Sequence, residues 1–395
     1  MIIVGTDWPM QKSDAATSHQ APHSHSYRYQ DSYQVGGSLL AESPLYIPRQ
    51  ADSDLYEAVR AGQMCSVLGS RQTGKSSLRV QVRHRLETQG YCCATLYATQ
   101  LLDSPQSYYR WEKQLISALW DSIHPSDTHR LRQWLTKTDS LLPQQRLEHF
   151  TRDLLASTLS DRPIVIFIDT AEALLNIPFL ASDLFDWLWH CHCLKRIYPI
   201  YKNLHFVVLG NTTTSELITN KSFLNICQQI PLQNFELAQT APLQLGFANR
   251  LEDPSQILQA ILRWTSGHPL LTQKFCAVAK SLMDEAGSGT SPVTPFPESL
   301  NQWIDHIAES HIIDRWNRQN DLSYLWDTWH QITQSKYKKQ LLTLYQRILD
   351  GHPVKLSGDQ IQSELLLSGL AIAKGEQLDS ANEIHRHIFA ALAQR

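Results

Sequence analysis

The chain has 395 residues, and a typical domain size of about 150 residues suggests two or three domains. Hydrophobic residues make up 42% and charged residues 18%, a composition that builds a packed core and excludes a disordered or fibrous protein. Lys and Arg number 35 against 38 Asp and Glu, and the net charge of -3 argues against binding of nucleic acid or a membrane surface along the whole chain.

Membrane insertion and disulfide bonding are not expected from this sequence. Its apolar runs all fall short of the ~18 residues that a bilayer-spanning helix needs. The stretch from Met1 to Asp7 lacks the basic and apolar regions of a secretory signal. The seven cysteines are odd in number and thinly spread, which is typical of a protein in a reducing compartment. We therefore expect a cytoplasmic protein.

The pattern along the chain changes three times. Residues 1–33 are rich in Ser, Gln, His and Tyr without periodicity, and we expect a mobile polar tail. Over 34–237, apolar runs alternate with amphipathic stretches, which predicts a parallel sheet covered by helices. The predicted strands are Met64–Leu68, Cys92–Ala98, Ile164–Ile168 and His205–Gly210. The predicted helices are Ser76–Leu86, Ser107–Ile123, Gln144–Leu159 and Leu184–Ile197.

Helical patterns dominate 238–335, interrupted by a loop at Gly287–Pro292. Residues 336–395 follow the order helix, helix, two short strands and helix, which suggests a winged helix. These elements are predicted at Gln340–Leu349, Ile361–Ser368, Leu370–Lys374, Gln377–Asp379 and Glu383–Leu392. The sequence therefore predicts an α/β core, a helical domain and a C-terminal winged-helix domain.

A phosphate-binding loop is the strongest motif in the chain. The pattern G-x-x-x-x-G-K-[ST] is matched by Gly69, Ser70, Arg71, Gln72, Thr73, Gly74, Lys75 and Ser76, between a predicted strand and a predicted helix. The glycines let backbone N–H groups approach the phosphates, and the helix N-terminus adds partial positive charge. Lys75 would contact the β- and γ-phosphates, and the Ser76 hydroxyl would bind Mg²⁺. The motif predicts a nucleotide site.

Three further polar residues follow the buried strands. Asp169 ends the third strand and would hold Mg²⁺, although an aspartate here could instead cap a helix. Thr170 comes next, where many ATPases carry a glutamate base, and Glu172 could partly substitute. Loss of a general base typically costs about 10²–10⁴ in rate, so we expect slow hydrolysis. Asn211, after the fourth strand, could orient the attacking water or be an ordinary turn residue.

Several segments resemble the AAA-like domain family found mostly in cyanobacteria, a branch of the STAND-type signalling ATPases. The resemblance extends from Tyr33 to the C-terminus. It is carried by Tyr33–Ser38, Tyr46–Asp52, Ser70–Arg79 including Ser77, Thr265–Gln273, Leu366–Leu370 and Asn382–Phe389. It implies an AAA+-type core, a helical lid and a winged helix. It also places Arg49 and Gln50 beside the adenine and ribose, and Pro269 near the base.

Proteins of this class usually act as switches, in which ADP holds a closed form and ATP permits an open, often oligomeric one. The resemblance therefore implies ATP or ADP with Mg²⁺ as cofactors, and a protein partner or self-association. Family members usually carry an Asp-Glu pair where this chain has Asp169 and Thr170. Many are fused to β-propellers or other effectors, whereas this chain stops after its predicted winged helix, so the output would lie on a separate protein.

Two alternative functions stay open. A DNA-associated ATPase could use the winged helix, but residues 336–395 carry eight basic and six acidic side chains, a weak charge for binding phosphates. A nucleotide-bound scaffold without turnover would also fit Thr170. Among other patterns, His190 and Cys193 could share one helix face but supply only two metal ligands. Lys195 and Arg196 could contact a phosphate across a subunit interface. We favour the alternative that they are ordinary cations at a helix C-terminus, where positive charge is stabilising.

Overall fold

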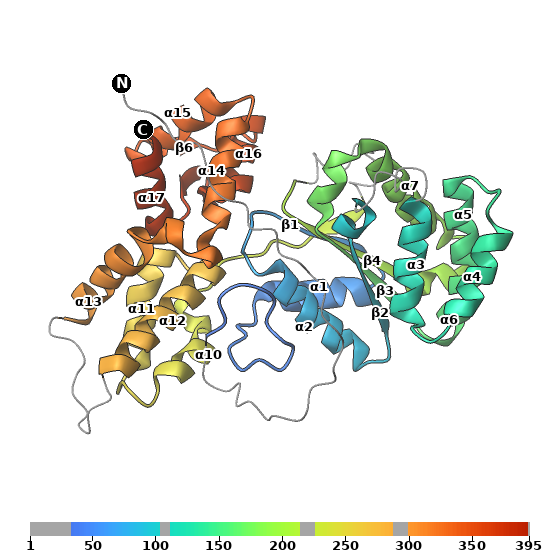
Figure 1. Cartoon of the computed structure of the whole chain (residues 1–395), viewed down its shortest axis with the longest axis horizontal. Coiled ribbons are helices and arrows are strands. Elements are labelled where there is room, and N and C mark those ends of the chain that lie inside the picture. The colour runs from blue at the N-terminus through green and yellow to red at the C-terminus, as the bar shows by residue number, and fades with distance from the viewer. Residues whose placement is uncertain (1–32, 103–110, 214–225, 287–298, 394–395) are drawn as a thin grey trace. The chain divides into compact units, whose positions relative to one another are not determined.

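The fold is that of a computed structural model, which describes residues 33–102, 111–213, 226–286 and 299–393. The predicted tail thus lies outside the described residues, apart from Tyr33. A five-stranded parallel sheet forms the first half of the described chain (Figure 1). Its strands, in spatial order, are β2 (Cys92–Tyr97), β3 (Ile164–Asp169), β4 (Leu204–Gly210), β1 (Met64–Leu68) and β5 (Cys227–Gln229).

The predicted parallel sheet is confirmed, with all neighbouring strands paired in parallel. Each of the four predicted strands agrees with the structure to within a residue or so at either end. Strand β5 was not predicted, because it has three residues and the last two are exposed, so no apolar run marks it. β4 lies between β1 and β3, which brings the ends of these three strands to one edge of the sheet.

Helices cover both faces of this sheet (Figure 1). Side chains alternate between faces along a strand, so Ile166 and Ile168 pack in one hydrophobic cluster, whereas Val165 and Phe167 pack in another. The first cluster is completed by helices that include α3 (Trp111–Ile123) and α7 (Pro178–Leu194). The second is completed by α1 (Gln50–Arg60) and α2 (Lys75–Glu87). Burial on both faces explains why these strands have continuous apolar sequences.

Two predicted helices differ from the structure. The stretch Gln144–Leu159 was predicted as one helix, but a π-helical turn at Phe150–Leu155 separates α5 (Pro143–His149) from α6 (Ala156–Asp161). The helix predicted from Leu184 begins earlier, at Pro178, since proline suits the first turn. α4 (Thr128–Lys137) was not predicted. The predicted start of α3 falls partly outside the described residues.

The second half of the chain is mainly helical, as the sequence predicts for 238–335. Its helices begin with α10 (Ala241–Gln244), α11 (Pro254–Thr265), α12 (Pro269–Ala286), α13 (Leu300–Ile307) and α14 (Tyr324–Gln334). The predicted loop at Gly287–Pro292 lies outside the described residues. Among the described helices, none has both the length and the apolar character that crossing a bilayer requires.

The last described segment follows the predicted order of elements. These elements are α15 (Lys338–Leu349), β6 (Val354–Lys355), α16 (Gln360–Ser368), β7 (Ala371–Lys374), β8 (Gln377–Ser380) and α17 (Glu383–Ala393). The strands form an antiparallel sheet in the order β6-β8-β7. The two-residue β6 was not predicted. The assignment of this segment as a winged helix stays a prediction, as do the domain bounds.

One hydrophobic cluster joins the helices of the second half, from Leu243 in α10 to Phe389 in α17. Tyr33, Leu45 and Ile47, which precede the sheet in sequence, are buried in this same cluster. The phenol of Tyr33 donates to the carbonyl of Leu243 at 2.6 Å. The segment before α1 therefore packs with the C-terminal core and not with the two clusters that cover the sheet.

Candidate functional site

The predicted phosphate loop joins β1 to α2 at the edge where the central strands end. Gly74 is the residue before the first turn of α2 and has a φ of 88°, in the left-handed region that favours glycine. A Cβ on Gly74 would lie 2.9 Å from Nη2 of Arg49, so a side chain here would also collide with that guanidinium. The loop therefore has the strand–loop–helix setting that the motif requires.

Lys75 is folded back onto the phosphate loop. Its ammonium donates to the carbonyls of Gly69 at 3.1 Å and Ser70 at 2.5 Å. Burial lowers the pKa of Lys75 to about 8, and the nearby carboxylates of Glu172 and Asp169 oppose this shift. The site thus holds a desolvated cation whose present partners are neutral carbonyls, and a phosphate oxygen would be a stronger partner.

Asp169 lies at the end of β3, as predicted, and lines the same cavity as Lys75 and Ser76. Its Oδ2 accepts from Nε of Arg79 at 3.0 Å, and both side chains are only 7% exposed. Its Oδ1 accepts from the N–H of Thr170 at 2.8 Å. A carboxylate oxygen can accept more than one hydrogen bond, so Asp169 retains capacity for a metal-bound water. The alternative role of Asp169, as a helix cap, is supported only by its contact with the N–H of Thr170 among the described residues.

Thr170 occupies a left-handed backbone conformation, with a φ of 57°. This is uncommon for a β-branched residue and marks a strained position. Its hydroxyl donates to the carbonyl of Asp169 at 2.6 Å. Thr170 lines the cavity but carries no group that could accept a proton from water as a carboxylate does.

Glu172 and Asn211 are joined by two hydrogen bonds, a contact that was not predicted from the sequence. The Oε1 of Glu172 accepts from Nδ2 of Asn211 at 2.6 Å, and Oε2 accepts from the backbone N–H of Asn211 at 2.8 Å. Both residues line the cavity that contains Lys75. The structure thus brings Glu172 and Asn211, two of the three predicted catalytic residues, together as one hydrogen-bonded pair just after β3 and β4.

The cavity around these residues has a volume of about 430 Å³, and we call it the phosphate cavity. It is lined by the phosphate loop, by the residues that end β3 and β4, and by a third group from the second half of the chain. That third group consists of Ser323, Tyr324 and Asp327. Residues that are about 250 positions apart in sequence therefore face the same space.

Arg71 makes the most direct contact between the phosphate loop and α14. Its Nη1 lies 2.8 Å from Oδ2 of Asp327. A second approach is made at Gly369, after α16, where a Cβ would lie 3.2 Å from Cβ of Ser70. The second half of the chain therefore contacts the phosphate loop at two of its residues.

A smaller recess opens on the other side of the phosphate loop, and we call it the base recess. It is lined by Gln34, Gly36, Gly37, Leu39, Tyr46, Ile47, Arg49, Gln72, Gly74, Ser77, Phe235, Pro269, Leu270 and Gln273. Arg49 and Pro269, predicted to lie near a base, are thus placed together, and Ser77 lies between the two cavities because it lines both.

Arg49 is fixed firmly at the edge of the base recess. Its Nη1 donates to the carbonyls of Thr73 at 2.8 Å and Gln233 at 3.1 Å. The guanidinium also lies over the ring of Phe235, 5.4 Å from the centroid. Burial lowers the pKa of Arg49, and the neighbouring Tyr46 and Asp52 oppose this effect. The arginine therefore ties the phosphate loop to the segment that follows β5.

Pro269 begins α12 after a turn that brings two chain segments together. Gly267 has a φ of 72°, and a Cβ there would lie 2.0 Å from the carbonyl oxygen of Phe235. The N–H of Phe235 donates to the carbonyl of Gly267 at 2.9 Å. This contact requires glycine at position 267, and it brings Phe235 and Pro269 to the same recess.

Gln50 is placed differently from its predicted partner Arg49. It begins α1, is exposed, and donates through Nε2 to Oδ1 of Asp54 at 2.9 Å. Gln50 lines neither the phosphate cavity nor the base recess. Its predicted contact with ribose stays a prediction that this geometry does not favour.

Three residues of the site were missed by the sequence analysis: Arg79, Asp327 and Gln273. Arg79 could have been suspected, since it lies one helical turn after Lys75 and Ser76 on α2. Asp327 lies in a helix far along the chain, where no motif marks it, and Gln273 ends the Thr265–Gln273 segment without having been given a role. Only the tertiary arrangement brings them to the phosphate loop.

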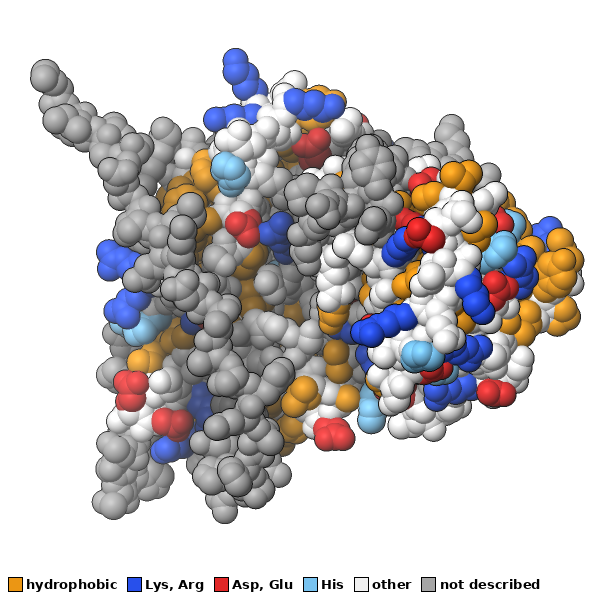
Figure 2. All heavy atoms as spheres, turned by 45° about the vertical axis from the view of Figure 1, so that its right-hand side comes forward, with side chains coloured by type: hydrophobic (Ala, Val, Ile, Leu, Met, Phe, Trp, Pro, Cys, Tyr) orange, Lys and Arg blue, Asp and Glu red, His pale blue; other side chains and the backbone are white. Residues whose placement is uncertain are grey.

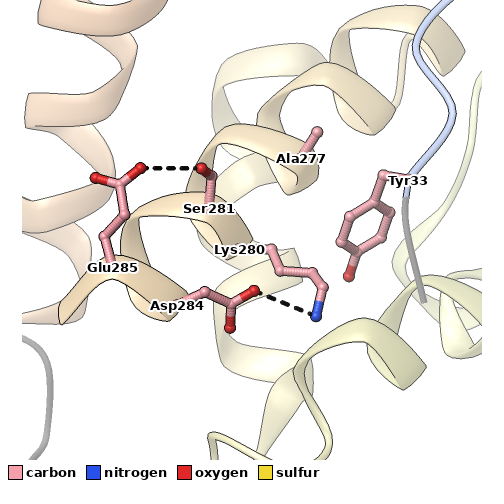
Figure 3. Close-up of a pocket in the computed structure, with 6 residues that line it drawn as sticks. All are labelled: Tyr33, Ala277, Lys280, Ser281, Asp284 and Glu285. Atoms are coloured by element: carbon pink, nitrogen blue, oxygen red, sulfur yellow. Dashed lines mark hydrogen bonds and ion pairs between the residues drawn. The ribbon is translucent and has the colours of Figure 1, made fainter. Parts of the chain in front are cut away.

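A further hollow among the described residues lies elsewhere. It has a volume of about 490 Å³ and is lined by Tyr33 and one face of α12 (Figure 3). There Lys280 pairs with Asp284, and Ser281 donates to Glu285 (Figure 3). None of the predicted site residues lines it. Within the described ranges, no group of three or more His, Cys, Asp or Glu side chains is arranged to hold a metal ion. His190 and Cys193 therefore belong to no such group.

Comparison with known proteins agrees with this geometry. A protein of Synechocystis sp. described as an uncharacterized WD repeat-containing protein is 33% identical over 362 residues, which cover 91% of this chain. The aligned region spans about 30% of the length of that relative. A Walker-type ATPase of Pyrococcus abyssi has a similar fold, with a TM-score of 0.53, 13% identity, and coverage of 91% of this chain and 99% of that one.

The ORC2 protein of Aeropyrum pernix is a more distant structural match, with a TM-score of 0.46 and 14% identity over 91% of this chain and 99% of that one. The likeness to the Pyrococcus abyssi ATPase shows the fold and no more. The sequence profile of the AAA-like domain matches residues 34–285, which include the phosphate loop, Asp169 and Pro269. The chain therefore belongs to the AAA-like domain family.

Proposed function

We propose that this protein is a nucleotide-controlled switch that binds ATP or ADP with Mg²⁺ and hydrolyses ATP slowly. One observation carries the proposal. The phosphate cavity is lined both by the phosphate loop and by Ser323, Tyr324 and Asp327 from the second half of the chain. A γ-phosphate in this cavity would therefore interact with both halves, and its presence or absence would change how favourable their contact is.

The residues fit a nucleotide. The backbone from Gly69 to Gly74 and the N-terminus of α2 provide N–H groups for the phosphates. Lys75 would exchange its carbonyl partners for phosphate oxygens, a stronger charge-assisted interaction. The base recess lies beside the phosphate cavity, and the two share Gly37, Gln72, Gly74 and Ser77 in their linings. One ligand with a base and phosphates could thus occupy both.

The residues also fit Mg²⁺. Ser76 and Asp169 line the same cavity, and a hydroxyl with a carboxylate is the pair that P-loop proteins use for this ion. Since Asp169 is already paired with Arg79, it would hold the ion through a water molecule. Bound Mg²⁺ would neutralise phosphate charge. Ser76 and Asp169 would orient it.

Slow hydrolysis is proposed from the groups around the γ-phosphate position. Thr170 donates its hydroxyl to a backbone carbonyl and cannot act as a base. Glu172 has both carboxylate oxygens engaged by Asn211. Because both oxygens already accept hydrogen bonds from Asn211, water activation by Glu172 would require this pair to separate.

Calorimetry with ATP and ADP tests the binding. The natural protein should bind both, and Lys75→Ala should weaken binding at least tenfold while far-UV circular dichroism shows an unchanged fold. Unchanged affinity in the variant would overturn the proposal. Phosphate release by the natural protein and by Thr170→Glu then tests turnover. If neither releases phosphate, the protein is a nucleotide-bound scaffold and the slow-ATPase part is wrong.

The switch is tested by hydrogen exchange in the presence of ADP or a non-hydrolysable ATP analogue. We expect faster exchange in α14 and α16 with the ATP analogue than with ADP. Equal exchange in both states would contradict nucleotide control.

On the face shown in Figure 2, described acidic and basic side chains are intermingled, which gives no support to DNA binding there. Salt-dependent binding of duplex DNA would favour that alternative.

A further inference from the structure

Gln273 is a buried side chain without a partner in the base recess. It lies in the second turn of α12, four residues after Pro269, and is 5% exposed. Both Oε1 and Nε2 of its amide are buried and have no hydrogen-bond partner among the described residues. A buried amide that leaves its donor and acceptor unpaired costs about 1–3 kcal/mol, so such a group calls for a missing partner.

The neighbours of Gln273 in the recess are bonded elsewhere. The Tyr46 hydroxyl donates to Asp52, the Arg49 Nη1 donates to two backbone carbonyls, and the Ser77 hydroxyl accepts from the N–H of Leu39. Much of the remaining wall is apolar and comprises Leu39, Ile47, Phe235, Pro269 and Leu270, and Gln34 and Gln72 add polar side chains. The recess thus combines apolar walls with a buried amide whose donor and acceptor are both unpaired, and Nε of Arg49 is a second buried donor without a partner among the described residues.

We infer that the Gln273 amide binds the hydrogen-bonding edge of a purine base. A carboxamide presents one acceptor and two donor hydrogens side by side. The 6-amino group of adenine and the ring nitrogen N1 beside it present the complementary donor and acceptor. A carboxamide pairs with adenine in a similar two-bond way in DNA complexes, there through N6 and N7. The aliphatic and aromatic walls would contact the faces of the ring. This inference rests on the proposed function, because the phosphates of the same nucleotide would lie against Lys75.

The recess has a volume of about 60 Å³ and must widen to take a purine. The wall at Gln34, Gly36 and Gly37 suits this movement. Gln34 is exposed, and its Nε2 bonds only to carbonyls of its own loop, those of Gly36 and Ser38. Gln273, by contrast, is held on α12, so the base edge would meet a fixed amide while the outer loop adjusts.

The test compares nucleotides that differ only at the base edge. Affinities of ATP, GTP and purine riboside 5′-triphosphate, which lacks a 6-substituent, are measured by calorimetry. The natural protein should bind ATP at least about tenfold more tightly than purine riboside triphosphate, the effect of leaving one buried polar group unpaired. In Gln273→Leu this difference should vanish. In Gln273→Glu, which has only acceptors, the ATP-to-GTP affinity ratio should fall about tenfold.

Two controls separate the possible failures. If the natural protein and Lys75→Ala have the same affinity for every nucleotide, the proposed function fails. If the natural protein binds ATP in a Lys75-dependent way but equally well as purine riboside triphosphate, only the Gln273 inference fails.

The stability of the empty protein gives an independent readout. Gln273→Leu should leave the melting temperature unchanged or raise it, because it removes an unpaired buried amide. The matched control is Gln362→Leu in α16. Gln362 is equally buried, but its amide accepts from the N–H of Ser357 and donates to the carbonyl of Lys355, so its loss should destabilise. If Gln273→Leu destabilises as much as Gln362→Leu, the amide has a structural partner and the inference is overturned.

Discussion

Arg71 of the phosphate loop and Asp327 of α14 form an ion pair of 2.8 Å at the rim of the phosphate cavity. The pair joins a residue next to the phosphates with a helix of the second half of the chain. A phosphate group entering this cavity would attract Arg71 and repel Asp327. A bound γ-phosphate would therefore compete with the ion pair, and under the proposed function this competition would link the nucleotide state to the position of α14.

The first prediction concerns this competition. Asp327→Asn removes a negative charge from the phosphate cavity and frees Arg71, so the affinity for ATP should rise more than that for ADP. Because both side chains are about half exposed, at 43% and 60%, the gain should be about two- to fivefold. Calorimetry at low salt measures it. Asp284→Asn, which removes a similarly exposed ion pair on α12, is the control. Equal gains in ATP and ADP affinity would contradict the competition.

A second prediction follows from the buried ammonium of Lys75. Its pKa is lowered to about 8 by burial, so the empty protein loses this charge as the pH rises above that value. A bound phosphate favours the protonated form. Raising the pH from 7 to 9 should therefore weaken nucleotide affinity by about tenfold, one factor of ten for each pH unit above the lowered pKa.

The Lys75 prediction has an internal control in stability. Between its lowered pKa of about 8 and its ordinary value of 10.5, the unfolded chain binds more protons at this residue than the folded one. This residue's contribution to the free energy of unfolding of the empty protein thus rises with pH, while nucleotide affinity falls. The difference in unfolding free energy between the natural protein and Lys75→Met measures it. This difference, natural protein minus variant, should become more positive as the pH rises from about 8 to 10, and a difference that becomes more negative would contradict the assigned sign.

A third prediction concerns Arg79, which is almost fully buried beside Asp169. Arg79→Met would leave the carboxylate of Asp169 buried without its cation, and we expect a loss of about 3–5 kcal/mol in unfolding free energy. Arg83→Met, one turn further along α2, removes a more exposed pair with Glu87 and should cost less than about 1 kcal/mol. Urea unfolding measures both. If Arg79→Met combined with Asp169→Asn recovered none of the stability, the assigned cause would be wrong.

A fourth prediction follows from two buried histidines of the second half. Burial lowers the pKa of His268 to about 3 and of His385 to about 4, and His385 accepts or donates to Tyr324 at 3.1 Å. Below the ordinary histidine pKa of 6.5, the unfolded chain takes up protons that the folded chain does not. Stability should therefore fall as the pH is lowered from about 6.5 toward 4.

The size of this effect can be measured with one substitution. At about 1.4 kcal/mol per pKa unit, His268 alone should account for up to about 3 kcal/mol at pH 4. His268→Phe keeps a ring against Tyr324, where the present stacking distance is 6.0 Å, and should flatten the pH dependence. The exposed His352→Phe should leave it unchanged. If unfolding free energy changed equally with pH in both variants, residues other than His268 would cause the proton uptake.

The sequence predicted best where one local pattern determines the structure. The run from Ile164 to Ile168 is apolar because both faces of β3 are covered, and the phosphate motif requires a strand before it and a helix after it. It predicted least where a contact depends on the tertiary arrangement. The pairing of Glu172 with Asn211 needs β4 to lie beside β3, and β5 is too short to show an apolar run. Asp327 belongs to the site only because α14 lies over the loop.

The burial of Tyr33, Leu45 and Ile47 in the C-terminal cluster has a consequence for synthesis on the ribosome. The sheet and its covering helices have their residues available once β5 has emerged. The C-terminal cluster instead needs side chains from the first fifty residues and from the last ten of the described chain. Its early apolar side chains stay exposed until α17 has been translated. If a nucleotide bound to the sheet half during synthesis, the segment with Tyr33, Leu45 and Ile47 would still lack its packing partners until the last helices had been made.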